Sequence, residues 1–252
     1  MSAAAWSPVS LAVVSAGVGD PRPTRRLADW VAEAVCRPLA AGGARAEVEV
    51  LELHRLAPDL AQRFAQRRAS LDLREAIAAV VATDGLVVAT PVLAASPSEV
   101  FDSFFAVLGD GVLSGTPVLL ALNSGSRWQP PDLTQVMRRR LTGVHADPVP
   151  TVVVAGPADW QATAHSDEGR LHTCIDQAAA ELAAAMRSHW QRPTALAWNS
   201  KQMYRHQQLF RIRINFDRSE GENRHEGSAF PRVRRPERPA LRGRGAARPR
   251  GR

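Results

Sequence analysis

Short apolar runs alternate with stretches in which apolar residues recur at helical spacing, from the N-terminus to about residue 190. The run at residues 10–14 is followed by a loop rich in Gly and Pro, and then by Leu27, Trp30 and Val31 at helical spacing. A short continuous apolar run is typical of a buried strand, whereas a spacing of three or four residues is typical of an amphipathic helix. The pattern predicts strands at residues 10–14, 46–53, 85–90, 117–122 and 151–155, and helices at residues 25–39, 73–81, 98–108, 133–141 and 171–186.

Strands that are almost wholly apolar and alternate with helices indicate a parallel sheet covered by helices on both faces. Because crossover connections are short and right-handed, five such strands predict the order 2-1-3-4-5, which is the doubly wound, three-layer, flavodoxin-like α/β fold. Ligands of such sheets bind at the carboxyl ends of the strands, beside the first strand. We therefore expect three loops to meet there: residues 15–24, 90–98 and 123–131.

The first of these loops has the features of a phosphate site. Backbone N–H groups and the N-terminus of the following helix come together here, and both attract anions. We predict that a phosphate is held by hydroxyl, backbone and guanidinium groups of Ser15, Gly17, Arg22, Thr24 and Arg25. Thr24 also suits the N-cap of the helix. The alternative is a plain turn before a capped helix, because Gly and Pro favour turns and the loop lacks the GxGxxG spacing of dinucleotide sites.

The second and third loops can hold a flat ring system. We predict ring contacts from Pro91, Val92, Leu93, Ala94 and Ser96 after the third strand, and from Asn123, Ser124 and Gly125 after the fourth. Trp128 either covers the ring or is an exposed turn residue. Phe101, Phe104 and Phe105 follow at i, i+3 and i+4, a spacing that favours core packing over stacking on the ring.

The net charge of +7 comes from the C-terminal part of the chain. Residues 193–252 hold 15 of the 32 basic and 5 of the 25 acidic residues, so residues 1–192 carry 17 basic and 20 acidic side chains. We therefore expect a flavodoxin-like domain over residues 1–192 and a basic tail over residues 193–252. The Arg-, Gly- and Pro-rich composition of the tail predicts disorder, and its abrupt onset suggests a frameshifted or fused end. The alternative role for the tail is nonspecific binding of nucleic acid or another anionic surface.

The sequence disfavours several other classes of protein. Cys36 and Cys174 lie in predicted helices without CxxC spacing, so we expect small buried side chains and neither a disulfide nor a zinc site. No uninterrupted apolar run reaches roughly 18 residues, and the start lacks the basic region of a signal peptide, which predicts a cytoplasmic protein without a membrane segment. The motifs GxSxG and HExxH are absent as well.

Taken together, the loop and strand motifs resemble the NAD(P)H-dependent FMN reductase family of flavodoxin-like fold, over about residues 8–187. The resemblance is carried by Ser15–Gly17, Thr24–Asp29, Asp84–Val92, Phe101–Phe105, Pro117–Leu120, Ser124–Ser126, Pro150–Thr151 and Asp159–Trp160. In that family the first loop holds the FMN phosphate and the next two hold the isoalloxazine ring. The resemblance implies hydride transfer from NAD(P)H to FMN without a catalytic acid or base, since the cofactor carries the chemistry. It also implies a homodimer.

The chain departs from the family pattern at the ligand loops. Arg22 and Pro23 stand where similar proteins usually have two serines, and Leu93 and Ala94 stand where they usually have an aromatic residue and an Asn. The third loop reads Asn-Ser-Gly at residues 123–125 in place of a Gly-Gly sequence. The alternative hypothesis is therefore a degenerate flavodoxin-like module with weak or no flavin binding, which acts as a binding or dimerisation partner.

Overall fold

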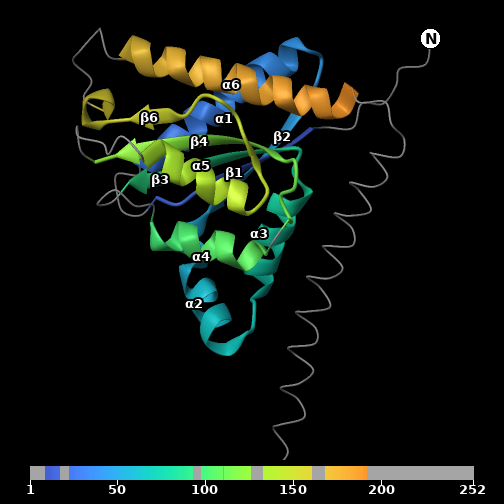
Figure 1. Cartoon of the computed structure of the whole chain (residues 1–252), viewed down its shortest axis with the longest axis vertical. Helices are drawn as coiled ribbons and strands as arrows, with labels where there is room; N and C mark the ends of the chain where they lie inside the picture. Colours follow the sequence, from blue (N-terminus) through green and yellow to red (C-terminus); the bar gives the residue numbers. More distant parts are fainter. Residues whose placement is uncertain are drawn as a thin grey trace, which may run out of the picture.

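The computed structural model describes residues 9–17, 23–92, 98–109, 111–125, 133–160 and 168–191 (Figure 1). Its strands are β1 (Val9–Ser15), β2 (Ala46–Glu52), β3 (Gly85–Val92), β4 (Pro117–Ser124), β5 (Asp147–Pro148) and β6 (Val153–Ala155). Its α-helices are α1 (Pro23–Ala41), α2 (Ala57–Gln66), α3 (Leu71–Ala82), α4 (Glu99–Leu108), α5 (Leu133–Gly143) and α6 (Glu168–Gln191). Two 3-10 turns, η1 (Leu53–Leu56) and η2 (Pro157–Trp160), complete the list. The predicted tail at residues 193–252 lies outside the described residues.

All strands pair in parallel, in the order β2-β1-β3-β4-β5, with β6 also paired to β4. The predicted flavodoxin-like order is therefore confirmed. In the register of the sheet, Ser15 lies opposite Glu52 on one side and Ala89 on the other, and Pro91 lies opposite Asn123. The carboxyl ends of β1, β2, β3 and β4 thus collect at one edge. The ladder between β1 and β3 ends at Ala89, so Pro91, which has no N–H, does not interrupt it.

The fifth position of the sheet is filled by two short strands instead of one. The strand β5 pairs with Pro117 and Val118 at the start of β4, and β6 pairs with residues 121–123 near its end. The prediction of a single strand at residues 151–155 is therefore corrected to β6 at residues 153–155, preceded by β5. Both pieces lie beside β4, so the topology is unchanged.

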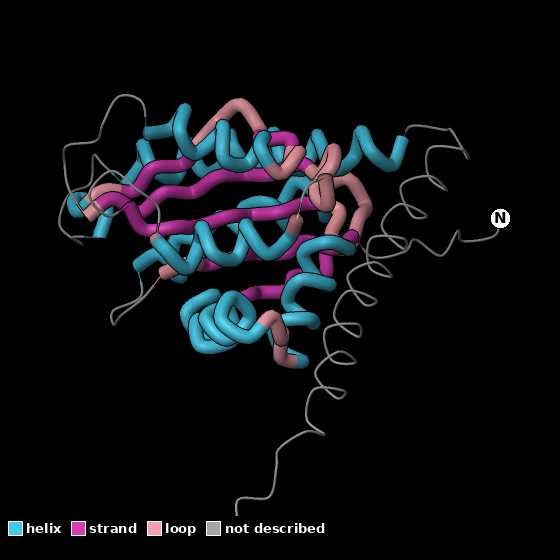
Figure 2. The backbone as a smooth tube through the Cα atoms, turned by 60° about the horizontal axis from the view of Figure 1, so that its bottom comes forward, coloured by secondary structure: helices cyan, strands magenta, loops and turns pink. Residues whose placement is uncertain are grey.

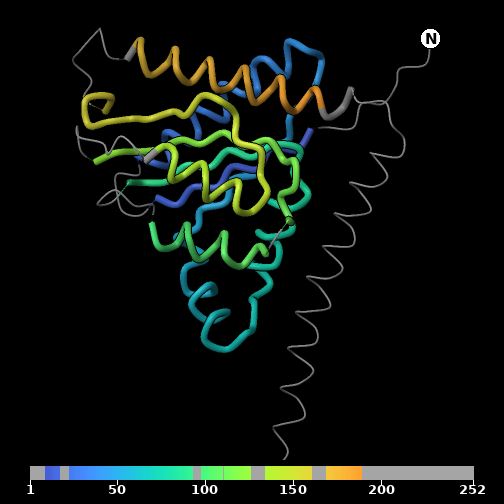
Figure 3. Tube along the Cα trace, in the orientation of Figure 1, coloured from blue at the N-terminus to red at the C-terminus, as the bar shows by residue number. Residues whose placement is uncertain are grey.

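Two apolar layers enclose the sheet, because successive strand residues point to opposite faces. On one face Leu11, Val13 and Leu119 pack under α1 and α6. On the other face Ala12, Val14 and their neighbours pack against η1, α2, α3, α4 and α5. Figures 2 and 3 show this three-layer arrangement, and Figure 1 shows α2 lying beyond α4 at the margin of the fold. None of the described helices is long and apolar enough to cross a lipid bilayer.

The phenylalanines of α4 belong to the core. Phe101 and Phe104 are 1% and 0% exposed, and the Phe101 and Phe105 rings lie 4.6 Å apart. The prediction of core packing is confirmed.

The structure corrects several local predictions. The segment before α3, in which no helix or strand was predicted, contains the helix α2. The helix α1 begins at Pro23, so Thr24 lies inside its first turn and is not the N-cap. Cys36 and Cys174 are free and half-buried instead of fully buried, and burial raises the pKa of both thiols.

Candidate functional site

The candidate site lies at the carboxyl edge of the sheet, where β1, β3 and β4 end. On β1, Ser15 shares the face of Leu11 and Val13, which is the face covered by α1 and α6. On β4, Asn123 shares the face of Leu119 and therefore points to the same side. The edge consequently has a side toward α1 and a side toward α4, and the two carry different polar groups.

On the side toward α1, three polar side chains form a continuous chain of hydrogen bonds. The indole Nε1 of Trp160 donates to Asn123 Oδ1 at 3.0 Å, and Asn123 Nδ2 donates to Thr24 Oγ1 at 3.2 Å. Thr24 is 2% exposed and Asn123 is 9% exposed. The chain joins η2, β4 and the first turn of α1. The Asn123 side chain, predicted to edge a ring, is thus held by two protein partners.

Two residues that are almost wholly buried beside the N-terminus of α1, Ser15 and Thr24, have hydroxyl groups that donate no hydrogen bond to any of the described residues. Thr24 Oγ1 makes one hydrogen bond there, as an acceptor, and Ser15, which is 2% exposed, makes none through its side chain. The first turn of a helix also leaves its N–H groups without partners within the helix. Because hydroxyl protons and helix N-terminal N–H groups all donate to anions, this donor set fits a phosphate group.

Gly17 is required where the chain leaves β1 for the first loop. A Cβ atom on Gly17 would lie 2.7 Å from Thr24 Cβ and 3.2 Å from Thr24 Oγ1. A larger residue at this position would therefore push the end of β1 away from the first turn of α1. The close approach keeps the backbone of residues 16 and 17 beside the Thr24 hydroxyl.

On the side toward α4, the polar groups mainly fix the protein to itself. Ser98 is the N-cap of α4: its Oγ accepts from the Phe101 N–H and donates to the carbonyl oxygen of Ala16 at 3.3 Å. The Ser98 N–H donates in turn to Thr90 Oγ1 at 3.5 Å. These bonds attach the start of α4 to the ends of β1 and β3. Ser124, predicted to contact the ring, is 3% exposed and points to this side of the sheet.

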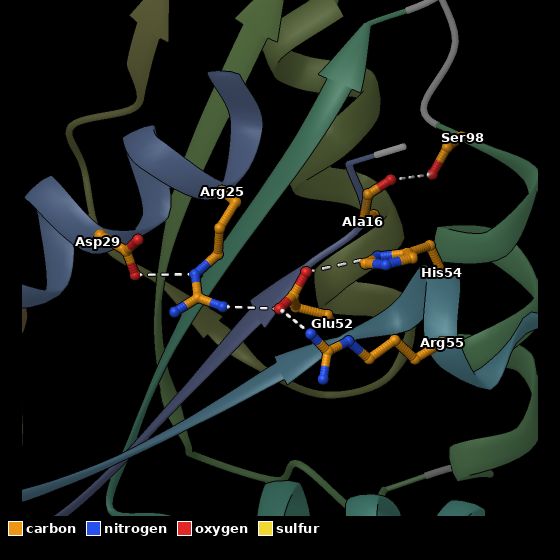
Figure 4. Close-up of polar contacts among 7 residues, drawn as sticks. All are labelled: Ala16, Arg25, Asp29, Glu52, His54, Arg55 and Ser98. Atoms are coloured by element: carbon orange, nitrogen blue, oxygen red, sulfur yellow. Dashed lines mark hydrogen bonds and ion pairs between the residues drawn. The ribbon is translucent and has the colours of Figure 1, made fainter. Parts of the chain in front are cut away.

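Arg25, predicted to bind phosphate, is engaged by two carboxylates (Figure 4). Its Nε lies 2.9 Å from Asp29 Oδ1, and its Nη1 lies 2.9 Å from Glu52 Oε1. Glu52 also accepts Arg55 Nη2 at 3.2 Å and lies 3.6 Å from His54 Nδ1. The positive charge of Arg25 is therefore largely balanced before any ligand binds.

The remaining predicted site residues divide into two groups. The structure places Pro91, Val92 and Gly125 at the ends of β3 and β4, and their predicted contacts with a ring stay predictions. Four others, Arg22, Leu93, Ala94 and Ser96, lie outside the described residues, as does Trp128. Their roles stay predictions.

Sequence reasoning assigned no role to the aromatic cluster that holds Trp160. Trp160 stacks on Trp30 with ring centroids 5.5 Å apart, and the Arg26 guanidinium lies 4.7 Å from the Trp30 centroid. Asp159 Oδ2 accepts from the Gly156 N–H at 2.6 Å and so fixes the turn that carries Trp160. The sequence did hold one signal for this cluster, because the pair Asp159–Trp160 is among the motifs that carry the family resemblance.

Comparisons with known proteins identify the family and support the fold. A family model of NADPH-dependent FMN reductases matches residues 9–161. A solved oxidoreductase from Corynebacterium diphtheriae is 36% identical, with a TM-score of 0.68, and the match covers 72% of this chain and 98% of that protein. A solved NADH:FMN oxidoreductase in its apo form is 22% identical, with a TM-score of 0.58, over 69% of this chain and 90% of that one, and it supports the fold. A comparison with curated proteins returned no match.

The family match spans more than half of the chain, and the solved oxidoreductase aligns with this chain over nearly its whole length. The family uses a flavin and a nicotinamide nucleotide. The carboxyl edge offers hydrogen-bond donors for a phosphate, and a reaction carried by the cofactor needs no catalytic dyad from the protein. This chain is therefore a flavin-related NAD(P)H oxidoreductase, and it belongs to the NADPH-dependent FMN reductase family.

Proposed function

We propose that this protein transfers a hydride from NAD(P)H to FMN bound at the carboxyl edge of the sheet. The observation that carries the proposal is the pair of hydroxyl groups on the buried residues Ser15 and Thr24, whose protons have no acceptor among the described residues. FMN, when bound, accepts the hydride on its ring, so the protein has only to bind and orient the two nucleotides.

Each part of the edge has a distinct role in this proposal. Ser15, Thr24 and the first turn of α1 donate hydrogen bonds to the phosphate, and Gly17 keeps the backbone close to that group. The ends of β3 and β4, with Pro91, Val92 and Gly125, form the rim on which the ring lies. The contacts with the phosphate and with the ring are completed by the loop residues Arg22, Leu93, Ala94 and Ser96.

The contacts of two side chains favour FMN that exchanges as a substrate over FMN that stays bound. Arg25 is paired with Asp29 and Glu52, so it adds little net charge toward a phosphate. Both ends of the Asn123 amide are bonded within the protein. Among the described residues, the donors to the phosphate are then neutral groups, and a hydrogen bond from a neutral group is weaker than one from a cation.

The test uses the full chain with FMN and both nicotinamide nucleotides. FMN fluorescence is titrated with protein, and NADPH or NADH consumption is then followed in the same sample. Saturable quenching at micromolar protein with turnover of either nucleotide is the expected result. The matched variants are Thr24→Val, at the site, and Thr142→Val, an exposed Thr at the end of α5.

Thr24→Val is expected to weaken FMN binding, and Thr142→Val is expected to leave it unchanged. A protein that neither quenches FMN nor consumes either nucleotide at concentrations well above micromolar would overturn the proposal. Binding without turnover would assign the edge to flavin but reject the reductase reaction.

A further inference from the structure

We propose that Trp160 is a positioning residue for phosphate recognition, which acts through Asn123 to leave the Thr24 proton available to the phosphate of FMN. This inference rests on the proposed function, because it assigns a role at the same site. It adds a specificity device: the three-residue chain makes the protein prefer FMN over riboflavin, which has the same ring and ribityl chain but no phosphate.

The orientation of the Asn123 amide follows from the chemistry of its neighbour. An indole N–H can only donate a hydrogen bond, so the atom of Asn123 that lies 3.0 Å from Trp160 Nε1 must be the carbonyl oxygen. The other end, 3.2 Å from Thr24 Oγ1, is therefore the NH₂ group. Trp160 thus decides which end of the amide faces α1.

That orientation decides the role of the Thr24 hydroxyl. Because the NH₂ group donates to Thr24 Oγ1, the hydroxyl is an acceptor in this bond and keeps its own proton. Thr24 is 2% exposed and lies in the first turn of α1, where helix N–H groups already favour an anion. If the amide were reversed, its carbonyl oxygen would accept a hydrogen bond from the Thr24 hydroxyl, and the phosphate would lose that donor.

Trp160 is held in place by groups that do not depend on the ligand. Its ring stacks on Trp30 at 5.5 Å, and Arg26 lies 6.0 Å from its centroid. The neighbouring residue, Asp159, fixes the turn η2 because its carboxylate accepts a hydrogen bond from the Gly156 N–H. A donor arranged before binding costs no reordering when the phosphate arrives, and it therefore favours affinity.

The first variant is Trp160→Phe, which keeps an aromatic ring against Trp30 but removes the indole donor. FMN and riboflavin dissociation constants are measured for the full chain by flavin fluorescence. We expect the affinity for FMN to fall about three- to tenfold, as for one net hydrogen bond, with riboflavin affinity unchanged. The matched control is Trp30→Phe, which removes an indole N–H from the same stack without touching Asn123 and should leave the ratio of the two constants as it is.

A second set of variants tests the order of the chain. Asn123→Ala interrupts it in the middle and serves equally well if Trp160→Phe does not fold, as circular dichroism would show. Thr24→Val removes the last member, so Trp160→Phe and Asn123→Ala should each have no further effect on the FMN-to-riboflavin ratio in the Thr24→Val background. Restoring a hydroxyl with Thr24→Ser should bring the effect of Trp160→Phe back.

Equal losses for FMN and riboflavin in the single variants, or additive losses in the Thr24→Val background, would overturn the inference, since a merely structural role for Trp160 predicts them. Wild-type protein that binds both flavins equally would overturn it too, while the proposed reaction would stand. Wild-type protein that binds neither flavin would reject the reaction as well.

Discussion

Two buried threonines at opposite edges of the sheet are bonded in opposite ways. At the amino edge, Thr83 is 1% exposed; its Oγ1 accepts from the Ala12 N–H at 2.8 Å and lies 3.0 Å from the Ser10 carbonyl oxygen and 2.6 Å from that of Gly85. At the carboxyl edge, Thr24 is 2% exposed, and among the described residues its hydroxyl only accepts, from Asn123. The Thr83 hydroxyl both accepts and donates within the fold, whereas the Thr24 hydroxyl donates to none of the described residues.

This difference in hydrogen bonding indicates that the two edges of the sheet have different roles. The neighbour of Thr83, Asp84, adds to the same junction, because its Oδ2 accepts from the Ser10 N–H at 3.0 Å and from Ser10 Oγ at 3.1 Å. A polar group satisfied within the protein stabilises the fold, whereas a buried donor without an acceptor costs stability and persists where a ligand supplies the acceptor. The amino edge therefore joins β1 to β3, whereas the carboxyl edge leaves a donor that, in the proposed function, binds the phosphate of FMN.

The largest expected effect is on flavin binding in Thr24→Val. A hydrogen bond to a charged group contributes about 1.5–3 kcal/mol, so FMN affinity should fall about ten- to a hundredfold. Riboflavin affinity should not change, because riboflavin has no phosphate. Titration of both flavins into the full chain measures the difference.

Stability should respond only modestly to the same change. The Asn123 NH₂ group loses one acceptor, which costs about 1 kcal/mol in urea unfolding. If FMN affinity were kept while stability fell by several times that amount, Thr24 would be a structural residue like Thr83, and the contrast between the edges would disappear.

The next effect is on stability in Thr83→Val. Removal of the hydroxyl leaves the buried Ala12 N–H without its partner, together with the carbonyl oxygens that Thr83 serves, and should lower the free energy of unfolding by about 1–3 kcal/mol. Urea unfolding followed by circular dichroism measures this loss. The ratio of FMN to riboflavin affinity should equal that of the wild type, and a selective loss of FMN would show that the amino edge also serves the ligand.

Local pattern was sufficient to predict the scaffold. Continuous apolar runs such as 85–90 and 117–122 marked the central strands, and the right-handed crossover rule then fixed their order. The helix α2 escaped prediction because it is marginal to the core: Leu60 is its buried residue, and Phe64 is 58% exposed. Thr24 was misplaced as a cap because Pro23, with no N–H to satisfy, begins the helix instead.

The sequence predicted which residues gather at the carboxyl edge, but not how they are bonded. Ser15, Thr24 and Asn123 follow from the rule that ligands bind at the carboxyl ends of strands. Their partners do not, because Asn123 meets Thr24 across 99 residues and Trp160 across 37. No periodicity in a sequence encodes such pairs. The bond between Arg25 and Glu52 likewise joins α1 to β2 across 27 residues, although Arg25 was expected to face the phosphate.

The smallest expected effect concerns Arg25 and Glu52. It tests whether the ion pair with Glu52 keeps the charge of Arg25 from acting on the phosphate. The Glu52 side chain is 10% exposed and lies at the end of β2, opposite Ser15, while it holds Arg25 at 2.9 Å. In Glu52→Gln, Arg25 keeps Asp29 but loses its less exposed anionic partner, so more of its charge acts on a nearby phosphate. We expect FMN affinity to rise about two- to fivefold at low salt, in line with the small contribution of partly exposed ion pairs.

The gain should shrink as the salt concentration rises, because ions screen the interaction, and riboflavin binding should not change. Glu49→Gln is the matched control, since it removes the same charge from an exposed position on the same strand. A fall in FMN affinity in Glu52→Gln alone would reverse the interpretation: Glu52 would then hold Arg25 in a productive position, and the carboxyl edge would bind phosphate with a cation oriented by the protein as well as with neutral donors.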